Sequence, residues 1–142
     1  MKAISIRQPW ANLILDGAKT IEFRNWRIAS MYLPLRVLVH AGQKYDLRDD
    51  LVPITWWEAQ YPFVQGAILG AVTIARIKEY PNYLILGEDC KENYTFTPSP
   101  CVKTYGWILK DPVKFNNPTK YKGRLRFFDT PFSESDFERA EQ

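Results

Sequence analysis

The sequence predicts an α+β protein: a small curled β-sheet or β-barrel of five to six mixed strands, with helices flanking it and closing its openings. The length of 142 residues fits one domain. Hydrophobic residues make up 46% of the chain and aromatic residues 15%, which is enough to bury a single core. Several short strand-like segments and few helix-like ones follow each other in mixed order, without an internal repeat or linker.

The first elements are a short strand over residues 2–6 and a helix over residues 8–19. Pro9 suits the first helical position, where its missing N–H would have had no partner. Gly17 suits the left-handed residue just past the helix end. Alternation then predicts a strand over residues 20–26.

The middle of the chain adds a mostly buried strand over residues 35–41. Residues 45–62 are expected to be helical in part, with an interruption at Pro53. The longest strand signal spans residues 66–80, where β-branched and small residues dominate, and Gly70 within it indicates a bend or bulge.

The last third begins with residues 81–103, which are expected to form a long irregular loop. Two final strands over residues 104–111 and 123–129 are expected to be joined by the basic segment 112–122. The polar end, residues 133–142, is expected to be an acidic tail or a short surface helix.

Charge is unevenly distributed although the net charge is only +3. Residues 1–44 hold seven Lys/Arg against two Asp/Glu, and residues 110–128 hold six against one. Residues 45–109 are acidic, with five Lys/Arg against eight Asp/Glu. Residues 129–142 are also acidic, with one Lys/Arg against five Asp/Glu. The two basic stretches either meet in space as a positive face that attracts phosphates, or form solvated strand edges.

Several classes of protein are excluded. The two cysteines, Cys90 and Cys101, make no disulfide framework, and reduced thiols are the expectation. No stretch reaches membrane-spanning length and no signal peptide precedes the chain, so a cytoplasmic protein is expected. The single histidine, His40, has no metal-ligating neighbours in sequence, and no glycine loop for nucleotides is present, so no metal or cofactor is expected.

The stretch from Gly17 to Trp26 concentrates charge in the strand that follows the first helix. Lys19 and Arg24 can hold a phosphate or a carbonyl, and Glu22 can accept a proton or pair with arginine. The alternative is an exposed strand face that carries an ordinary ion pair. Alternation puts Lys19 and Glu22 on opposite faces unless a turn or bulge redirects Lys19.

Aromatic residues accompany these charges. Trp10, Trp26, Tyr105 and Trp107 lie in or beside the expected strands and helix and can stack on bases. Core packing is the better interpretation for Trp10 and for one of Tyr105 and Trp107. Trp26 shares a face with Glu22 and Arg24, which makes it the better stacking candidate.

A basic hairpin is expected over residues 110–126, where Tyr121 and Phe115 are interleaved with cations and Asp111 is the one acidic residue. Such a pattern is typical of contact with a nucleic-acid backbone and carries no sequence specificity of its own. Its cations are Lys110, Lys114, Lys120, Lys122, Arg124 and Arg126.

The opening "SIRQPWANLILDGAKTIEFRNW" resembles the signature of the ASCH domain family (activating signal cointegrator homology). That family carries a G-x-K-x-x-E-x-R pattern, which is here Gly17, Lys19, Glu22 and Arg24. The residues from Ser5 to Ala11 resemble the coactivator-like branch, and "YGWILKDP" and "YKGRLRFF" are similar to the closing strands of such domains. The resemblance covers about residues 2 to 129.

The resemblance implies a PUA-like β-barrel with a cleft into which the motif side chains project. It therefore implies a domain over residues 1–130 followed by the tail 131–142. Many members are assigned as nucleic-acid binders, usually of RNA. Some small bacterial members are amidohydrolases that remove the acetyl group from N4-acetylcytidine, and another is described as a ribonuclease.

The amidohydrolase branch has a threonine where this chain has Glu22, and it uses a separate downstream glutamate. Glu79, Glu88 and Glu92 are candidates for that glutamate by position. Lys19 is then the one residue carried over directly.

Two functions follow from these observations. The first is binding of RNA, single-stranded nucleic acid or a nucleotide, and the second is hydrolysis of an acylated cytidine nucleoside, with Lys19 and Glu22 as catalytic residues. The residues expected to contact nucleic acid or substrate are Arg7, Gln8, Trp10, Lys19, Thr20, Glu22, Arg24, Trp26, His40, Trp107, Lys122 and Arg124.

Overall fold

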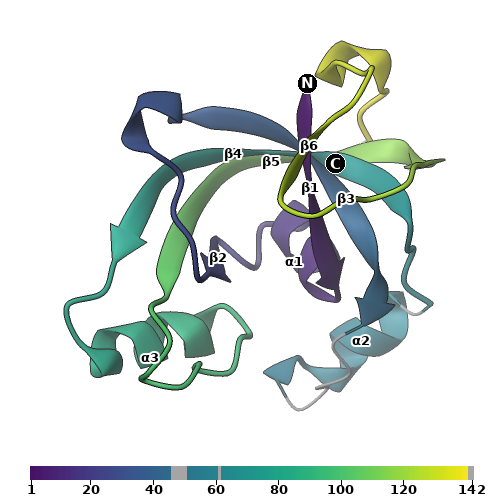
Figure 1. Cartoon of the computed structure of the whole chain (residues 1–142). Helices are drawn as coiled ribbons and strands as arrows, with labels where there is room; N and C mark the ends of the chain where they lie inside the picture. The colour runs from purple at the N-terminus through teal and green to yellow at the C-terminus, as the bar shows by residue number, and fades with distance from the viewer. Residues whose placement is uncertain (46–50, 61, 141–142) are drawn as a thin grey trace.

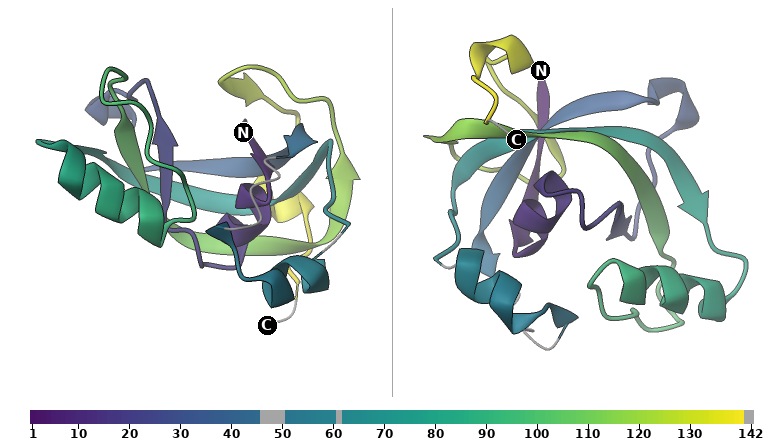
Figure 2. Two further views of the ribbon diagram at one scale, coloured as in Figure 1. Left: turned by 90° about the horizontal axis from the view of Figure 1, so that it is seen from below. Right: turned by 180° about the vertical axis from the view of Figure 1, so that it is seen from behind.

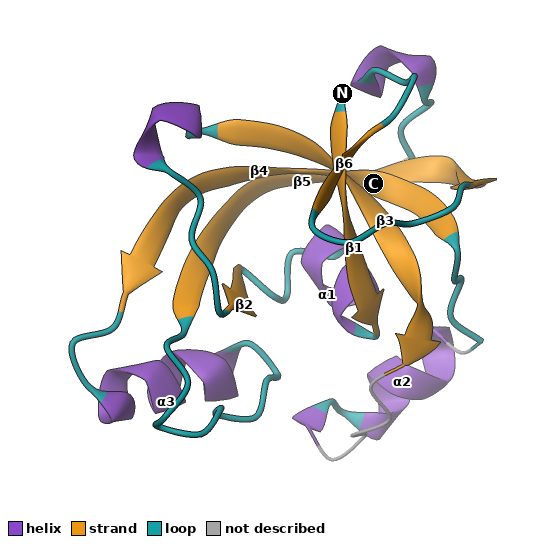
Figure 3. Ribbon diagram, viewed as in Figure 1, coloured by secondary structure: helices purple, strands orange, loops and turns teal. Residues whose placement is uncertain are grey.

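A computed structural model describes residues 1–45, 51–60 and 62–140 and contains one six-stranded mixed sheet within those residues (Figures 1 and 3). The strand order is β2-β5-β4-β3-β1-β6. Among the described strands only β1 and β3 pair in parallel, and the other pairings are antiparallel. The strands are β1 (Lys2–Gln8), β2 (Ile21–Arg24), β3 (Leu35–Tyr45), β4 (Ala67–Glu79), β5 (Tyr105–Lys120) and β6 (Phe127–Asp129).

The sheet curls into a half-barrel, with helices flanking it (Figure 2). Helix α1 lies inside the concave side, and α2 and α3 lie near the ends of the long strands. The α+β fold and the curled barrel predicted from the sequence are confirmed. The helices are α1 (Trp10–Leu15), α2 (Ile54–Gln60) and α3 (Tyr83–Glu92), with 3₁₀ turns η1 (Ser30–Tyr32) and η3 (Glu134–Asp136).

Helix α1 is shorter than predicted, and Pro9 caps it rather than occupying its first turn. Gly17 has φ +81°, the left-handed conformation predicted for it. The backbone N–H groups of Ala18 and Lys19 both donate to the Leu13 carbonyl, at 3.0 Å. This tight turn redirects the chain before β2 and turns the Lys19 side chain toward the interior.

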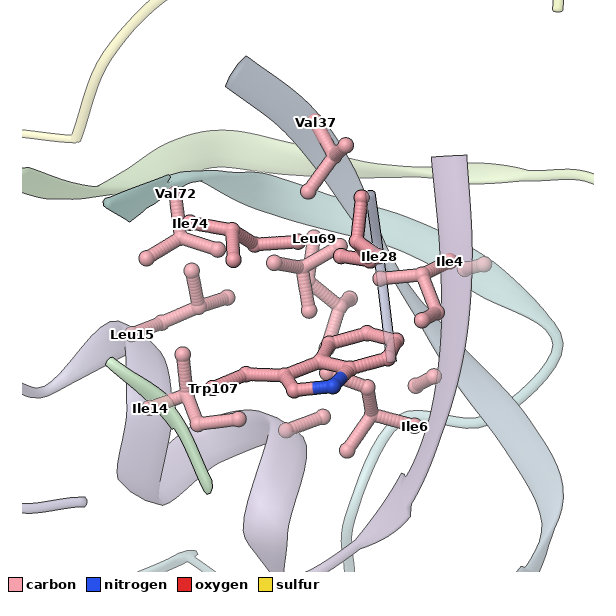
Figure 4. Packing of buried hydrophobic residues seen from close by; sticks show 14 residues of the cluster. Ile4, Ile6, Ile14, Leu15, Ile28, Val37, Leu69, Val72, Ile74 and Trp107 are labelled. Atoms are coloured by element: carbon pink, nitrogen blue, oxygen red, sulfur yellow. The ribbon is translucent and has the colours of Figure 1, made fainter. Parts of the chain in front are cut away.

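The main core fills the space between α1 and the concave face of the sheet (Figure 4). Ile14 and Leu15 of α1 meet Leu69, Val72 and Ile74 of β4 in this cluster (the side chains labelled in Figure 4). Trp107 is 1% exposed and is the largest of the fully buried side chains among the described residues. Burial of such a cluster is the main term that holds helix and sheet together.

A bulge bends β4 at Gly70, as the sequence predicted. The register with β3 shifts between Val39 and His40, and the register with β5 shifts on either side of Gly70. A side chain at Gly70 would run into the Val113 carbonyl and the Leu15 side chain. Only glycine allows this close approach of strand to strand and strand to helix.

The prediction of an irregular loop over residues 81–103 was wrong, because α3 lies there. The Asn82 side chain caps the helix by accepting from the Ile85 N–H at 3.0 Å. Asp89 accepts hydrogen bonds from Lys78 Nζ at 2.7 Å and from Tyr80 Oη at 2.8 Å. A ten-residue helix is marginal alone, so these contacts with the end of β4 stabilise it.

The predicted basic hairpin was also wrong. The segment 112–122 continues β5 as far as Lys120, and β6 pairs with β1 rather than with β5. The strand β5 accommodates its prolines because its pairing with β4 is irregular. The register against β4 shifts, and Asp111 has a left-handed backbone conformation at φ 52°. The strand expected over residues 123–129 is reduced to β6, and residues 121–126 form a loop, termed the 121–126 loop below.

Two other segments lie near the described limits. Helix α2 follows Pro53, whereas the rest of the expected helical segment at residues 46–50 and 61 lies outside the described residues. Beyond β6 the chain returns to β5, where the Ala140 N–H donates to the Lys114 carbonyl at 2.8 Å. No helix in the described part of the chain is long and apolar enough to cross a membrane.

Candidate nucleic-acid interface

A cavity of about 550 Å³, the first cavity below, opens where β1, β2, the end of β3 and the 121–126 loop meet. The curl of the sheet makes this possible, because it brings β2 at one edge close to β1 near the other. Arg24 on β2 donates from Nη2 to the Ser5 carbonyl on β1, at 3.1 Å. The lining residues are Ser5, Arg7, Trp10, Glu22, Phe23, Arg24, Gly42, Gln43, Lys44, Thr95, Arg124, Leu125 and Arg126.

Glu22 and Arg24 form an ion pair in the wall of the first cavity. Arg24 donates to Glu22 Oε2 from Nε at 3.2 Å and from Nη2 at 3.0 Å. The Glu22 side chain is only 8% exposed and that of Arg24 25% exposed, so the pair is largely desolvated. The Arg24 guanidinium also lies 5.7 Å from the centre of the Trp107 ring, within the range of a cation–π contact.

Lys19 is enclosed behind the cavity wall and is only 1% exposed. Its Nζ donates to the Asn93 carbonyl at 3.0 Å and to Thr95 Oγ1 at 2.8 Å. The ammonium also lies 5.0 Å from the Phe23 ring and 5.7 Å from the Trp10 ring. Burial lowers the pKa of Lys19 from 10.5 to about 8, and the nearby Glu22 carboxylate opposes this shift.

Asn93, at the end of α3, ties this wall together. Its side-chain Oδ1 accepts from the backbone N–H of Thr20 at 2.8 Å and of Ile21 at 3.0 Å. Its own carbonyl accepts from Lys19. The residues that follow α3 are therefore fixed against the start of β2, and Thr95 is held at the cavity surface.

Cations dominate the lining of the first cavity. Among the described residues, five that line the cavity are basic, and Glu22, already paired with Arg24, is the one acidic residue. The basic residues are Arg7, Arg24, Lys44, Arg124 and Arg126. Arg126 is held in a left-handed conformation at φ 57°, with its guanidinium 4.6 Å from the Trp26 ring. Such a lining produces a positive potential that attracts anions.

A second cavity of about 450 Å³ lies beside the first. His40 lines it, with Nδ1 3.0 Å from Ser5 Oγ and Nε2 2.7 Å from the Tyr121 carbonyl. Because a carbonyl can only accept, Nε2 carries the proton of the neutral ring and Nδ1 accepts from Ser5. The second cavity is lined by Ser5, His40, Gly42, Gln43, Lys122, Gly123, Arg124 and Leu125.

The predicted site residues fall into four groups. Arg7, Trp10, Glu22, Arg24 and Arg124 line the first cavity, whereas His40, Lys122 and Arg124 line the second. Lys19 lies behind the wall. Gln8, Thr20, Trp26 and Trp107 line neither cavity.

The residues outside the cavities have other contacts. Gln8 is fully buried and anchors α1 by donating to Asn12 Oδ1 at 2.9 Å. Trp26 packs edge-on against Trp107 at 4.8 Å, because β2 ends at Arg24 and the alternation that placed Trp26 beside Glu22 stops there. Trp10 packs against the main core, as expected, and it also borders the first cavity and donates to the Tyr94 carbonyl at 3.0 Å.

Sequence reasoning missed several lining residues, among them Ser5, Gln43, Thr95 and Leu125. Ser5 alone carried a signal, because it precedes Arg7 in the motif-like opening. Thr95 follows a helix that was predicted as a loop, and Leu125 lies in a loop that was predicted as a strand.

The three candidates for the downstream glutamate of the amidohydrolase branch lie away from the first cavity. Glu79 is 3.9 Å from Arg27 and more than half exposed, and Glu88 and Glu92 are on the exposed side of α3. None of the three lines the first cavity. In the described ranges no group of three His, Cys, Asp or Glu side chains could hold a metal ion, and Cys90 and Cys101 are unpaired thiols.

Comparison with solved structures gives the same fold. The crystal structure of ASCH from Zymomonas mobilis superposes with a TM-score of 0.63 at 17% identity, covering 95% of this chain and 90% of that one. Two single-site mutants of that protein superpose with TM-scores of 0.60, also at 17% identity, covering 95% of this chain and 91% and 93% of theirs. No curated protein matches this chain. The family profile described as the ASCH domain matches residues 4–121, and the chain therefore belongs to the ASCH domain family.

Proposed function

We propose that this protein binds single-stranded RNA, or a nucleotide of it, in the first cavity. The observation that carries the proposal is the charge of the lining: the part of the chain that the structure describes contributes five basic side chains and one carboxylate that is already paired. Each unpaired cation of the lining attracts the phosphate of a ligand and so increases its affinity. The Glu22 carboxylate repels the phosphate little, because Arg24 neutralises its charge.

The size of the cavity supports the same ligand. A volume of about 550 Å³ lies within the range of roughly 300–1,000 Å³ found for small-molecule sites and is large enough for one nucleotide. A base can enter only if it is unstacked, which favours a single strand over a duplex.

The lining residues divide into polar and aromatic contacts. Arg7, Lys44 and Arg124 are exposed cations that would contact phosphate. Trp10 takes the base-stacking role that the sequence suggested for Trp26, because Trp10 borders the cavity. Lys19 holds Thr95 in the wall rather than touching the ligand.

The proposal predicts salt-dependent RNA binding. A fluorescently labelled RNA oligonucleotide should bind in an anisotropy titration, and its affinity should fall linearly with salt on logarithmic axes. Arg7→Ala and Lys44→Ala should each reduce the slope by about 0.7, since one phosphate contact is lost in each. Lys110→Ala removes the same charge from β5 outside both cavities and should leave the slope unchanged. Binding that is absent, or equally affected by all three substitutions, would overturn the proposal.

A second candidate function is amide hydrolysis of an N4-acetylated cytidine, or cleavage of the bound RNA. It is favoured by one observation, the buried Lys19 with a pKa lowered to about 8, because a neutral amine can attack a carbonyl or take a proton from water. A cytoplasmic location suits either function.

The hydrolase is tested by incubating the protein with N4-acetylcytidine and separating the products by chromatography. Release of cytidine that Lys19→Met abolishes, in a variant whose circular dichroism is unchanged, would establish hydrolysis. We expect no release, because Lys19 is enclosed and no unpaired carboxylate of the described residues borders the first cavity. Intact RNA after the same incubation would exclude a ribonuclease.

A further inference from the structure

We propose that the second cavity is a subsite for the neighbouring nucleotide of the same strand, so that the ligand is an oligonucleotide of at least two residues. This inference rests on the function proposed above and specifies its ligand. It assigns the Lys122–Leu125 segment a role in recognising the length of the strand.

The two cavities are continuous along one wall. Ser5, Gly42, Gln43, Arg124 and Leu125 line both of them. A strand that leaves the first cavity along this wall enters the second directly. The volumes of about 550 and 450 Å³ are similar, and each has room for one nucleotide.

The chemistry of the second cavity suits a phosphodiester. Lys122 and Arg124 are cations, and no acidic residue within the described ranges lines this cavity. Arg124 is the cation shared by both cavities, so it lies where the phosphate that joins two nucleotides would pass. Lys122 borders only the second cavity and would contact the nucleotide beyond that phosphate.

The 121–126 loop is held in place before any ligand binds. His40 bonds to the Tyr121 carbonyl and to Ser5 Oγ, and it is 1% exposed. A side chain at Gly123 would come within 2.6 Å of His40 Cε1, so the loop lies directly on the imidazole ring. Arg126 anchors the other end on Trp26. A loop fixed in this way loses little entropy on binding.

This fixed loop presents Leu125 to solvent. The side chain is 93% exposed, lies between Arg124 and Arg126, and borders both cavities. A single exposed leucine needs no explanation by itself. Its position on the wall common to two cation-lined cavities gives it a role, because an apolar side chain there can pack on the face of a base or on a ribose.

The test compares ligands that differ by one nucleotide. Calorimetric affinities would be measured for the four ribonucleoside 5′-monophosphates and for the four homodinucleotides that carry a 5′-phosphate. The best dinucleotide should bind at least tenfold more tightly than its monophosphate. Lys122→Ala should remove most of this gain and leave the monophosphate affinity unchanged, whereas Lys110→Ala should change neither.

Leu125 is tested by the same pair of ligands. Leu125→Ala should weaken the dinucleotide by threefold or more, whereas Met31→Ala, which truncates another exposed apolar side chain (81% exposed), should have no effect. Monophosphates that bind while dinucleotides bind no better would overturn the second subsite and leave the proposed function intact. If neither ligand binds, both proposals fail. An undiminished gain in Lys122→Ala also overturns the subsite.

Discussion

The free energy of unfolding of this protein should rise by about 3 kcal/mol relative to that of a Lys19→Met variant as the pH is raised from 7 to 10.5. Burial lowers the pKa of Lys19 to about 8 in the folded state, against 10.5 when the side chain is solvated. Between these values the unfolded chain binds more protons, so stability increases with pH. Below pH 8 the full cost of burying the ammonium is present.

The measurement is urea denaturation of both proteins at half-unit pH intervals. The difference between them isolates Lys19, because the other titrating groups are common to both. Lys110→Met is the matched control, since it replaces an exposed lysine by the same residue. A difference between the parent and Lys19→Met that stays constant with pH would contradict the enclosed position of the Lys19 amine.

Substitution of Arg24 by methionine should lower the free energy of unfolding by about 3 kcal/mol and weaken RNA binding about a hundredfold. The change removes two hydrogen bonds to Glu22 and one to the Ser5 carbonyl. It leaves a carboxylate that is 8% exposed without its cation. That carboxylate then adds a negative charge to a cavity that attracts phosphate.

The double variant Glu22→Gln/Arg24→Met separates these effects. It removes the unpaired charge, so it should recover more than half of the lost stability. It lacks the guanidinium, so RNA affinity should stay well below that of the parent. Equal stability of the single and double variants would show that the ion pair does not carry the effect.

The sequence predicted the parts of the fold and the candidate site that depend on local pattern. Gly17, with its left-handed conformation, and the bulge at Gly70 were both predictable, because a glycine in those contexts has a definite steric reason. The family motif located Glu22 and Arg24, which both line the first cavity. Trp26, which was expected on the same strand face, does not line it.

The remainder depends on contacts between distant residues. Helix α3 is stabilised by Lys78 and Tyr80 through Asp89, and a local pattern cannot reveal this. The strand β5 passes Pro112 because its register against β4 shifts there, between the pairs Ala71–Val113 and Thr73–Lys110. Leu125 borders two cavities only because β6 pairs with β1, which sets where the 121–126 loop crosses the sheet.

The strand order also determines which backbone groups are open to another molecule of the same protein. The edge strands β2 and β6 are the shortest, with four and three residues, whereas β4 and β5, with 13 and 16 residues, lie inside the sheet. Beyond β2, the side of β5 that faces away from β4 is covered by residues 138–140, which bond to Asn116 and Lys114. Residues 138–140 therefore protect the edge of β5 from pairing with a strand of another molecule. A chain shortened before Glu138 would expose the backbone N–H and C=O groups of β5 to such pairing.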